Sequence, residues 1–124
     1  AACGIQAAYP ERPVIAIIGD GSSMYSIQAL WTAANQKLPI TYIICDNGGY
    51  RIIKERLHAF HGNENFIGMD FKDPGVDFVG LAQSLGMPST RVNTHDELIP
   101  ALEAALANRS GPNLLSVTVD RGRF

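Results

Sequence analysis

Several residue types are scarce in this chain of 124 residues, and each scarcity argues against a class of protein. Two cysteines, Cys3 and Cys45, are too few for a disulfide framework, so we expect free thiols in a reducing cytoplasm. No apolar run approaches the length of a membrane span, and nothing resembles a signal peptide. The 10 basic residues face 12 acidic ones and form no basic run, which argues against a nucleic-acid-binding protein.

The remaining composition is that of a folded domain. Apolar residues make up 46% of the chain and charged residues 18%, which places it far from intrinsically disordered sequences. The length fits one domain. Residues 1–8 read as the tail of a helix with neither a cap nor an initiator methionine. We therefore expect residues 1–124 to form one domain that belongs to a longer chain.

Short apolar runs alternate with helical patterns along the sequence. The β-branched and apolar runs predict four strands, at residues 14–18, 40–45, 89–93 and 114–119. The first of them is continuously apolar and is expected to be buried on both faces, as in a parallel sheet. Strands that alternate with helices favour right-handed βαβ units. The chain is therefore predicted to be an α/β protein, a three-layer αβα sandwich around a mostly parallel, doubly wound sheet.

Local signals predict where the helices begin. Ser22 or Ser23 is expected to cap a helix whose apolar stripe runs to Ala34. Asp77 is expected to cap another helix, and residues 94–97 have the spacing of a capping box. Pro100 should kink the last helix or delay its start.

Three further expectations concern packing. Trp31 is expected to lie in the core, while residues 50–60 should form a helix with Arg51, Lys54, Glu55 and Arg56 on its solvated side. Residues 61–76 show no period and carry several large apolar side chains. Such a segment is typical of a lid, a mobile loop or a surface covered by a partner, and its apolar content favours the covered surface.

Glycines and polar residues follow two of the predicted strands. The first strand ends in residues 19–22, Gly-Asp-Gly-Ser, and the second in residues 46–49, Asp-Asn-Gly-Gly. Because the carboxyl ends of parallel strands share one edge of a sheet, Asp20 and Asn47 are expected to meet there. Carboxylate, amide and backbone oxygens suit Mg²⁺, and glycines with a helix start suit a phosphate. The two turns together predict a site for a metal-bridged diphosphate.

Other interpretations fit less well. Gly-Asp-Gly alone is often only a tight turn, but the second motif at Asn47 makes a shared site the better interpretation. A dinucleotide fingerprint lacks its third glycine, because Met24 stands in that place, and there is no phosphate-loop Gly-Lys-Ser/Thr. A phosphoacceptor receiver domain also has aspartates at strand ends and binds Mg²⁺, but Gly-Asp-Gly and the stripe after it fit that class worse.

The two motifs closely resemble the thiamine diphosphate motif of thiamine-dependent decarboxylases and synthases. The resemblance covers essentially the whole chain, as the C-terminal diphosphate-binding domain. Within that family, residues 25–27, 29–34 and 74–78 look most like benzoylformate decarboxylase. One position departs from the family pattern, which usually has two asparagines, because Asp46 precedes Asn47 here. A carboxylate beside a diphosphate is unfavourable if it points inward.

The resemblance implies a set of site residues. Mg²⁺ would be bound by the side chains of Asp20 and Asn47 and by the backbone oxygen of Gly49. Ile52 and Ile53 would lie near the substrate pocket. The cofactor thiamine diphosphate would be held by Gly19, Asp20, Gly21, Ser22, Tyr25, Asn47, Gly48, Gly49 and Tyr50.

The resemblance also implies that catalysis needs another domain. The glutamate that activates the cofactor belongs to the family's N-terminal pyrimidine-binding domain, supplied by a neighbouring subunit of a homodimer or homotetramer. No catalytic residue is therefore assigned within this chain. The implied function is anchoring of thiamine diphosphate in a 2-oxo acid decarboxylase, a lyase. Two alternatives stay open: the same domain of an acetolactate synthase-like carboligase, or a non-catalytic assembly module.

Overall fold

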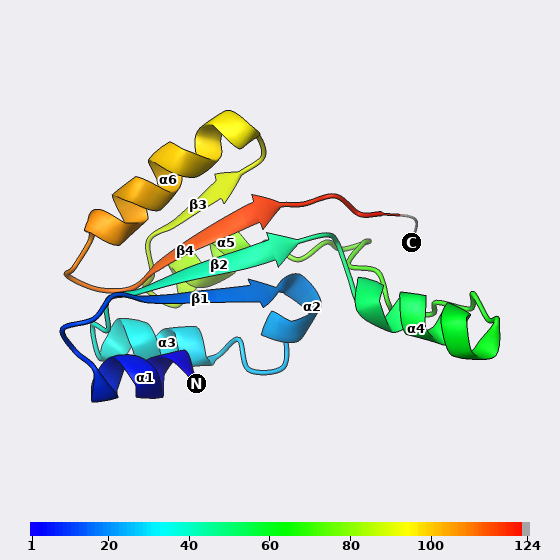
Figure 1. Cartoon of the computed structure of the whole chain (residues 1–124), viewed down its shortest axis with the longest axis horizontal. Helices are drawn as coiled ribbons and strands as arrows, with labels where there is room; N and C mark the ends of the chain where they lie inside the picture. The colour runs from blue at the N-terminus through cyan, green and yellow to red at the C-terminus, as the bar shows by residue number, and fades with distance from the viewer. Residues whose placement is uncertain (123–124) are drawn as a thin grey trace.

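Four parallel strands form the centre of the molecule, in the order β1-β2-β4-β3, in a computed structural model that describes residues 1–122 (Figure 1). The strands are β1 (Val14–Gly19), β2 (Ile40–Asp46), β3 (Ser89–Val92) and β4 (Asn113–Thr118). The helices are α1 (Ala2–Ala8), α2 (Asp20–Ser23), α3 (Ala29–Asn35), α4 (Arg51–His61), α5 (Phe78–Ser84) and α6 (His95–Ala107). The predicted α/β sandwich with a parallel sheet is confirmed; residues 123 and 124 of the predicted domain lie outside the described residues.

Helices cover both faces of this sheet. Figure 1 shows α6 over β3 and β4 on one face, with α1, α3 and α5 on the other. The main core lies on the face of α3 and α5, where apolar side chains from both helices meet those of the two central strands. Its buried members are Leu30, Ala33, Ile40, Tyr42, Ile44, Phe78, Ala82, Met87 and Leu114.

The edge strand β1 is less buried than the sequence predicts. Its residues alternate between half-buried and exposed, and Ile15 and Ile17 are 46% and 69% exposed. The prediction that β1 is buried on both faces is therefore wrong within the part of the chain that the structure describes. The physical reason is that α1 packs against one face of β1, while α6 lies over β3 and β4 and leaves the other face bare (Figure 1).

The helix predicted to follow Ser22 or Ser23 begins later, as α3 at Ala29. The four-residue helix α2 ends at Ser23, and turns separate it from α3. Neither serine caps a helix; instead the Ser23 hydroxyl donates to the backbone oxygen of Asp20 at 2.7 Å. Trp31 is 55% exposed, so its predicted place in the core is wrong, because α3 turns Leu30 and Ala33 toward the sheet.

The remaining helices begin close to the predicted residues. Asp77 stands at the N-cap of α5 but makes no capping bond, because its carboxylate accepts from Arg91 at 2.7 Å. The capping box of α6 is confirmed, with Glu97 accepting the N–H of Thr94 at 3.1 Å. That helix begins before Pro100, so the proline does not delay its start.

The helix α4 projects away from the sheet (Figure 1). Its predicted range is confirmed, but Lys54 is not on a solvated side, because it is only 4% exposed. Of the segment predicted to be irregular, 61–76, His61 still belongs to α4, and residues 62–76 contain no helix or ladder strand, although Asp70 makes an isolated bridge to Gly49. Both cysteines are free. Within residues 1–122, no helix has the length and apolar character needed to span a membrane.

Candidate functional site

The adjacent strands β1 and β2 end side by side and bring Asp20 and Asn47 together, as predicted. Asp20 directly follows β1, and the glycine loop, residues 47–49, directly follows β2. One carboxylate oxygen of Asp20 accepts the backbone N–H groups of Asn47, Gly48 and Gly49 at 3.1, 2.7 and 2.9 Å. This carboxylate therefore fixes the glycine loop from the neighbouring strand.

The Asp20 carboxylate is also tied to its own turn. Its second oxygen accepts the N–H of Gly21 at 2.8 Å, and the residue is only 1% exposed. A buried carboxylate with four backbone donors has its charge well solvated by the protein. Because α2 has four residues and the Gly21 N–H is already used, the predicted contribution of a helix start to phosphate binding is weaker than the sequence suggests.

The side-chain amide of Asn47 lies beside the Asp20 carboxylate and the Gly49 carbonyl. One of its two polar atoms lies 2.9 Å from the Gly49 carbonyl oxygen and 3.2 and 3.3 Å from the two Asp20 carboxylate oxygens. If that atom is the nitrogen, it donates to these oxygens. If it is the oxygen, three residues present oxygens to one another with no proton between them, and a cation bound among them would relieve their repulsion.

This donor set fits Mg²⁺. Two adjacent ligands of an octahedral Mg²⁺ are about 2.9 Å apart, since each lies 2.0–2.1 Å from the ion. The Asn47 amide atom lies 2.9 Å from the Gly49 carbonyl oxygen, which matches this spacing, and 3.2 and 3.3 Å from the Asp20 oxygens, which is slightly longer. Within residues 1–122 no three acidic, histidine or cysteine side chains gather as a metal site. A cation at this edge would therefore depend on one carboxylate, one amide and one backbone carbonyl.

Asp46, the residue that departs from the family pattern, lies beside this set. Its carboxylate accepts the N–H of Gly48 at 3.1 Å. Burial, and then the negative charge of Asp20, raise the pKa of the Asp46 carboxyl above its ordinary value of 3.8. The Asp46 carboxylate is thus partly turned inward and repels Asp20. This is the unfavourable arrangement described in the sequence analysis, a carboxylate that points toward the diphosphate site.

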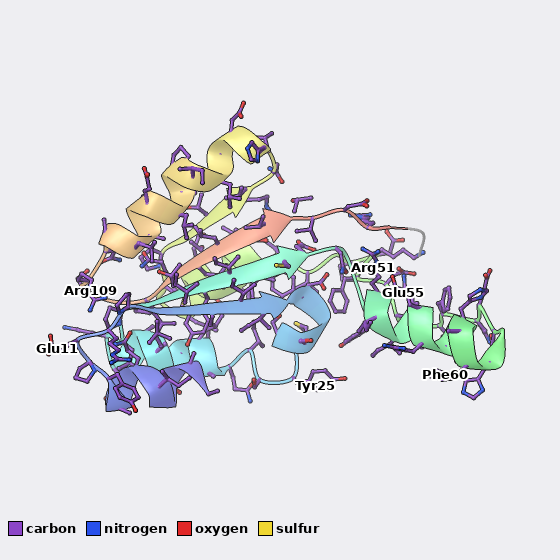
Figure 2. All side chains as sticks on the ribbon, viewed as in Figure 1. Glu11, Tyr25, Arg51, Glu55, Phe60 and Arg109 are labelled. Carbon is purple, nitrogen blue, oxygen red and sulfur yellow. The ribbon has the colours of Figure 1, made fainter. Side chains whose placement is uncertain are left out.

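A pocket of about 510 Å³ opens at this edge of the sheet. Figure 2 shows Tyr25 on the loop after α2 and Arg51 and Glu55 on α4, the elements that form two of its walls. The pocket brings together eight of the nine residues predicted to bind the cofactor. They are Gly19, Asp20, Gly21, Ser22, Tyr25, Asn47, Gly49 and Tyr50.

Among the predicted cofactor residues, Gly48 alone does not line the pocket. The lining also includes Ile52 and Ile53, the two residues predicted to lie near a substrate. The sequence did not identify Arg51 and Glu55 as pocket residues, because their charges fit an exposed helix face. In the fold they form an ion pair of 2.8 Å at the base of α4.

An open parallel sheet with a pocket at its carboxyl edge is typical of nucleotide- and cofactor-binding domains. Comparison with known families identifies the family to which this domain belongs. The family described as "Thiamine pyrophosphate enzyme, C-terminal TPP binding domain" matches residues 1–117, and the chain belongs to this family. The family binds thiamine diphosphate, and Mg²⁺ is typical of it.

Individual relatives include both decarboxylases and synthases. Benzoylformate decarboxylase of Pseudomonas aeruginosa is 41% identical over 86% of this chain and 20% of its own length. An acetolactate synthase large subunit of Parasynechococcus marenigrum is 33% identical over 98% of this chain and 19% of its own. The solved thiamine diphosphate-dependent 4-hydroxybenzoylformate decarboxylase of Rhodococcus jostii RHA1 is 40% identical, with a TM-score of 0.88 over 96% of this chain and 22% of that one. The chain therefore spans about a fifth of the length of these relatives.

Proposed function

We propose that this chain anchors the diphosphate of thiamine diphosphate through Mg²⁺, as the C-terminal domain of a longer 2-oxo acid decarboxylase in the cytoplasm. The convergence of Asp20, Asn47 and the Gly49 carbonyl at one point of the pocket carries this proposal. Three protein ligands leave octahedral Mg²⁺ with positions for diphosphate oxygens and a water. Relatives at about 40% identity support a thiamine-dependent enzyme of this group; they include two decarboxylases and also a putative acetolactate synthase large subunit of Mycobacterium tuberculosis, 39% identical over 96% of this chain and 24% of its own length.

The residues of this chain have distinct tasks in the proposal. Asp20 holds the glycine loop and, with Asn47 and Gly49, the metal. Ser22, Tyr25 and Tyr50 surround the diphosphate, and Gly19 leaves room for it. Gly48 stands behind them and holds the loop through its N–H bond to Asp20 at 2.7 Å, while Gly21 leaves room for the Tyr50 ring. Thiamine diphosphate, when bound, supplies the electron sink for loss of CO₂ from a 2-oxo acid. No residue of this chain is proposed to move a proton in that reaction.

The far side of the pocket supports the proposal that a second domain completes the site. Tyr25 and Ile52 are 76% and 60% exposed at the pocket, although an aromatic and a branched apolar side chain gain from being covered. We propose that the N-terminal pyrimidine-binding domain of a neighbouring subunit covers them in a homodimer or homotetramer. Ile52 and Ile53 would then form an apolar wall near the 2-oxo acid substrate.

The experiment that tests the proposal measures cofactor binding in the full-length protein. Titration with thiamine diphosphate and MgCl₂ should raise its midpoint of thermal unfolding, and Asp20→Ala should abolish that rise. Glu103→Gln, a change on the exposed side of α6, is the matched control and should leave the rise intact. An undiminished rise in Asp20→Ala would refute the proposed anchor.

A second candidate is an acetolactate synthase-like carboligase. The relative from Parasynechococcus marenigrum, an acetolactate synthase large subunit, favours it. Both enzymes would use the same anchor, so the pocket does not separate them. Product analysis does: CO₂ and an aldehyde from benzoylformate identify the decarboxylase, whereas a condensed hydroxy acid from pyruvate identifies the carboligase. A full-length protein that binds the cofactor and turns over neither substrate would support the non-catalytic assembly module.

A further inference from the structure

The chain beyond α4 folds back on the glycine loop (Figure 1). We name residues 66–72 the strap. The N–H of Phe71 donates to the Gly48 carbonyl at 2.8 Å, and the N–H of Tyr50 donates to the Met69 carbonyl at 2.8 Å. Between these two bonds, Gly49 and Asp70 face each other as an antiparallel bridge. The strap is therefore joined to both sides of Gly49.

This bridge sets the direction of the Gly49 peptide groups. In such a pair the flanking residues exchange the hydrogen bonds, and the two facing residues direct their own N–H and C=O groups away from each other. The N–H of Gly49 accordingly reaches Asp20 at 2.9 Å. Its carbonyl oxygen lies 2.9 Å from the end of the Asn47 amide. The strap thus turns the carbonyl of Gly49 toward the proposed cation position.

Glycine is required at this place because the strap lies so close. A Cβ built on Gly49 would overlap the Met69 carbonyl oxygen and stand 3.1 Å from the Cα of Asp70. A further contact closes the strap, since the rings of Tyr50 and Phe71 pack edge to face with 5.0 Å between their centroids. The loop and the strap therefore behave as one packed unit.

Lys54 holds the strap from the other side. The residue is 4% exposed, and its ammonium makes an ion pair with the Asp70 carboxylate. The same nitrogen lies 5.7 Å from the centre of the Phe66 ring. The backbone N–H of Lys54 bonds to the carbonyl of Tyr50 at 3.1 Å, directly after the glycine loop. Because a buried ammonium without a partner is costly, this pair keeps Asp70 opposite Gly49.

We propose that Lys54 and Asp70 are positioning residues of the metal site, which hold the strap so that the Gly49 carbonyl stays directed at the cation. Neither residue lines the pocket. They act through the backbone of the loop, as outer partners orient the ligands of other metal sites. The inference rests on the proposed function, because it assigns Gly49 as a ligand of Mg²⁺.

The test uses the full-length protein saturated with thiamine diphosphate and titrated with MgCl₂. Two readouts are followed, the midpoint of thermal unfolding and the rate of turnover. Lys54→Met and Asp70→Asn should each raise the Mg²⁺ concentration at half-maximal effect by about ten- to a hundredfold. At saturating Mg²⁺ the kcat should return close to that of the unchanged protein, because the catalytic groups are untouched.

Lys72→Met is the matched control. Lys72 lies 3.7 Å from the same carboxylate, but its side chain is 73% exposed, so its removal should leave the Mg²⁺ dependence unchanged. If Lys54→Met does not fold, Asp70→Asn decides, since it keeps the shape of the side chain. The inference is overturned if the variant loses stability without metal but reaches its half-maximal effect at the same Mg²⁺ concentration as the unchanged protein. This holds for Lys54→Met, or for Asp70→Asn if Lys54→Met does not fold.

The two proposals fail in different ways. If Asp20→Ala keeps its Mg²⁺-dependent rise, the proposed function itself is wrong. If Asp20→Ala loses that rise while Lys54→Met and Asp70→Asn respond to Mg²⁺ as the unchanged protein does, only the positioning role is wrong.

Discussion

The carboxylate of Asp20 accepts the backbone N–H of Gly49 at 2.9 Å, across 29 positions of sequence. The bond joins the ends of β1 and β2, and the Gly49 carbonyl lies near the same Asn47 amide atom as the two carboxylate oxygens of Asp20. Two proposed metal ligands are thus connected to each other before any metal binds. The stability of the loop and its affinity for Mg²⁺ should therefore change together.

Asp20→Asn should destabilise the metal-free protein. The asparagine has the same shape, but its NH₂ group would face backbone donors where a carboxylate oxygen accepts them now. We expect a loss of about 2 to 3 kcal/mol in the free energy of unfolding, the scale of hydrogen bonds to a buried charge. Denaturant unfolding without Mg²⁺ measures it. Glu103→Gln should change the value little, and an Asp20→Asn protein as stable as the parent would contradict the role of Asp20 in fixing the loop.

Gly49→Ala should separate the loop from the strap. The added methyl group would overlap the Met69 carbonyl, so the backbone must shift, at a cost of about 2 kcal/mol. The Gly49 carbonyl would move with it, and the affinity for Mg²⁺ should fall as well. Gly111→Ala is the control, since a Cβ there meets nothing within 4 Å. A Gly49→Ala protein with normal stability and normal Mg²⁺ affinity would show that the close contact is unimportant.

Asp46→Asn should stabilise the metal-free protein near neutral pH. Burial and the charge of Asp20 raise the pKa of Asp46 above 3.8, so folding opposes its ionisation and stability falls as pH rises through the raised pKa. Asparagine keeps the acceptor for the Gly48 N–H without the charge. The gain in unfolding midpoint should be present near neutral pH and disappear below about pH 3.8, where Asp46 is protonated. Equal midpoints at neutral pH would count against the charge repulsion.

The ion pair of Lys54 and Asp70 should give an acid-dependent contribution. Its hydrogen bond from Lys54 lowers the pKa of the Asp70 carboxyl below 3.8, so the stabilisation is complete above that value and is lost as pH falls through the lowered pKa. Asp70→Asn should cost about 2 kcal/mol near neutral pH, less than for a fully buried pair because the Asp70 side chain is 34% exposed. Unfolding curves at several pH values should show this difference shrinking in acid, and a difference that is constant with pH would contradict it.

Much of the site followed from the sequence because it depends on strand ends. The strands β1 and β2 each stop at polar residues among glycines, and parallel strands place such ends at one edge, so Asp20 and Asn47 lie together as predicted. The αβα layers followed from the alternation of apolar runs. A single sequence does not show which strand lies at the edge of the sheet. The exposure of Ile17, which follows from the edge position of β1, was therefore not predicted.

The strap was missed for a different reason. Lys54 falls on the charged side of the α4 pattern, which is typical of a solvated helix face. Its burial comes from Asp70, which lies in a segment without any period, and long-range pairing of that kind leaves no local signal. Only the fold shows that the irregular segment packs on the glycine loop and covers the lysine.

The most direct test of the central claim is the position of the metal. Crystals of the full-length protein with thiamine diphosphate and Mn²⁺ in place of Mg²⁺ would show the metal by its anomalous scattering. The account predicts one peak at the pocket, bonded to a carboxylate oxygen of Asp20, the amide oxygen of Asn47 and the carbonyl oxygen of Gly49, with the diphosphate against it. A diphosphate bound with its metal on other residues would contradict the account.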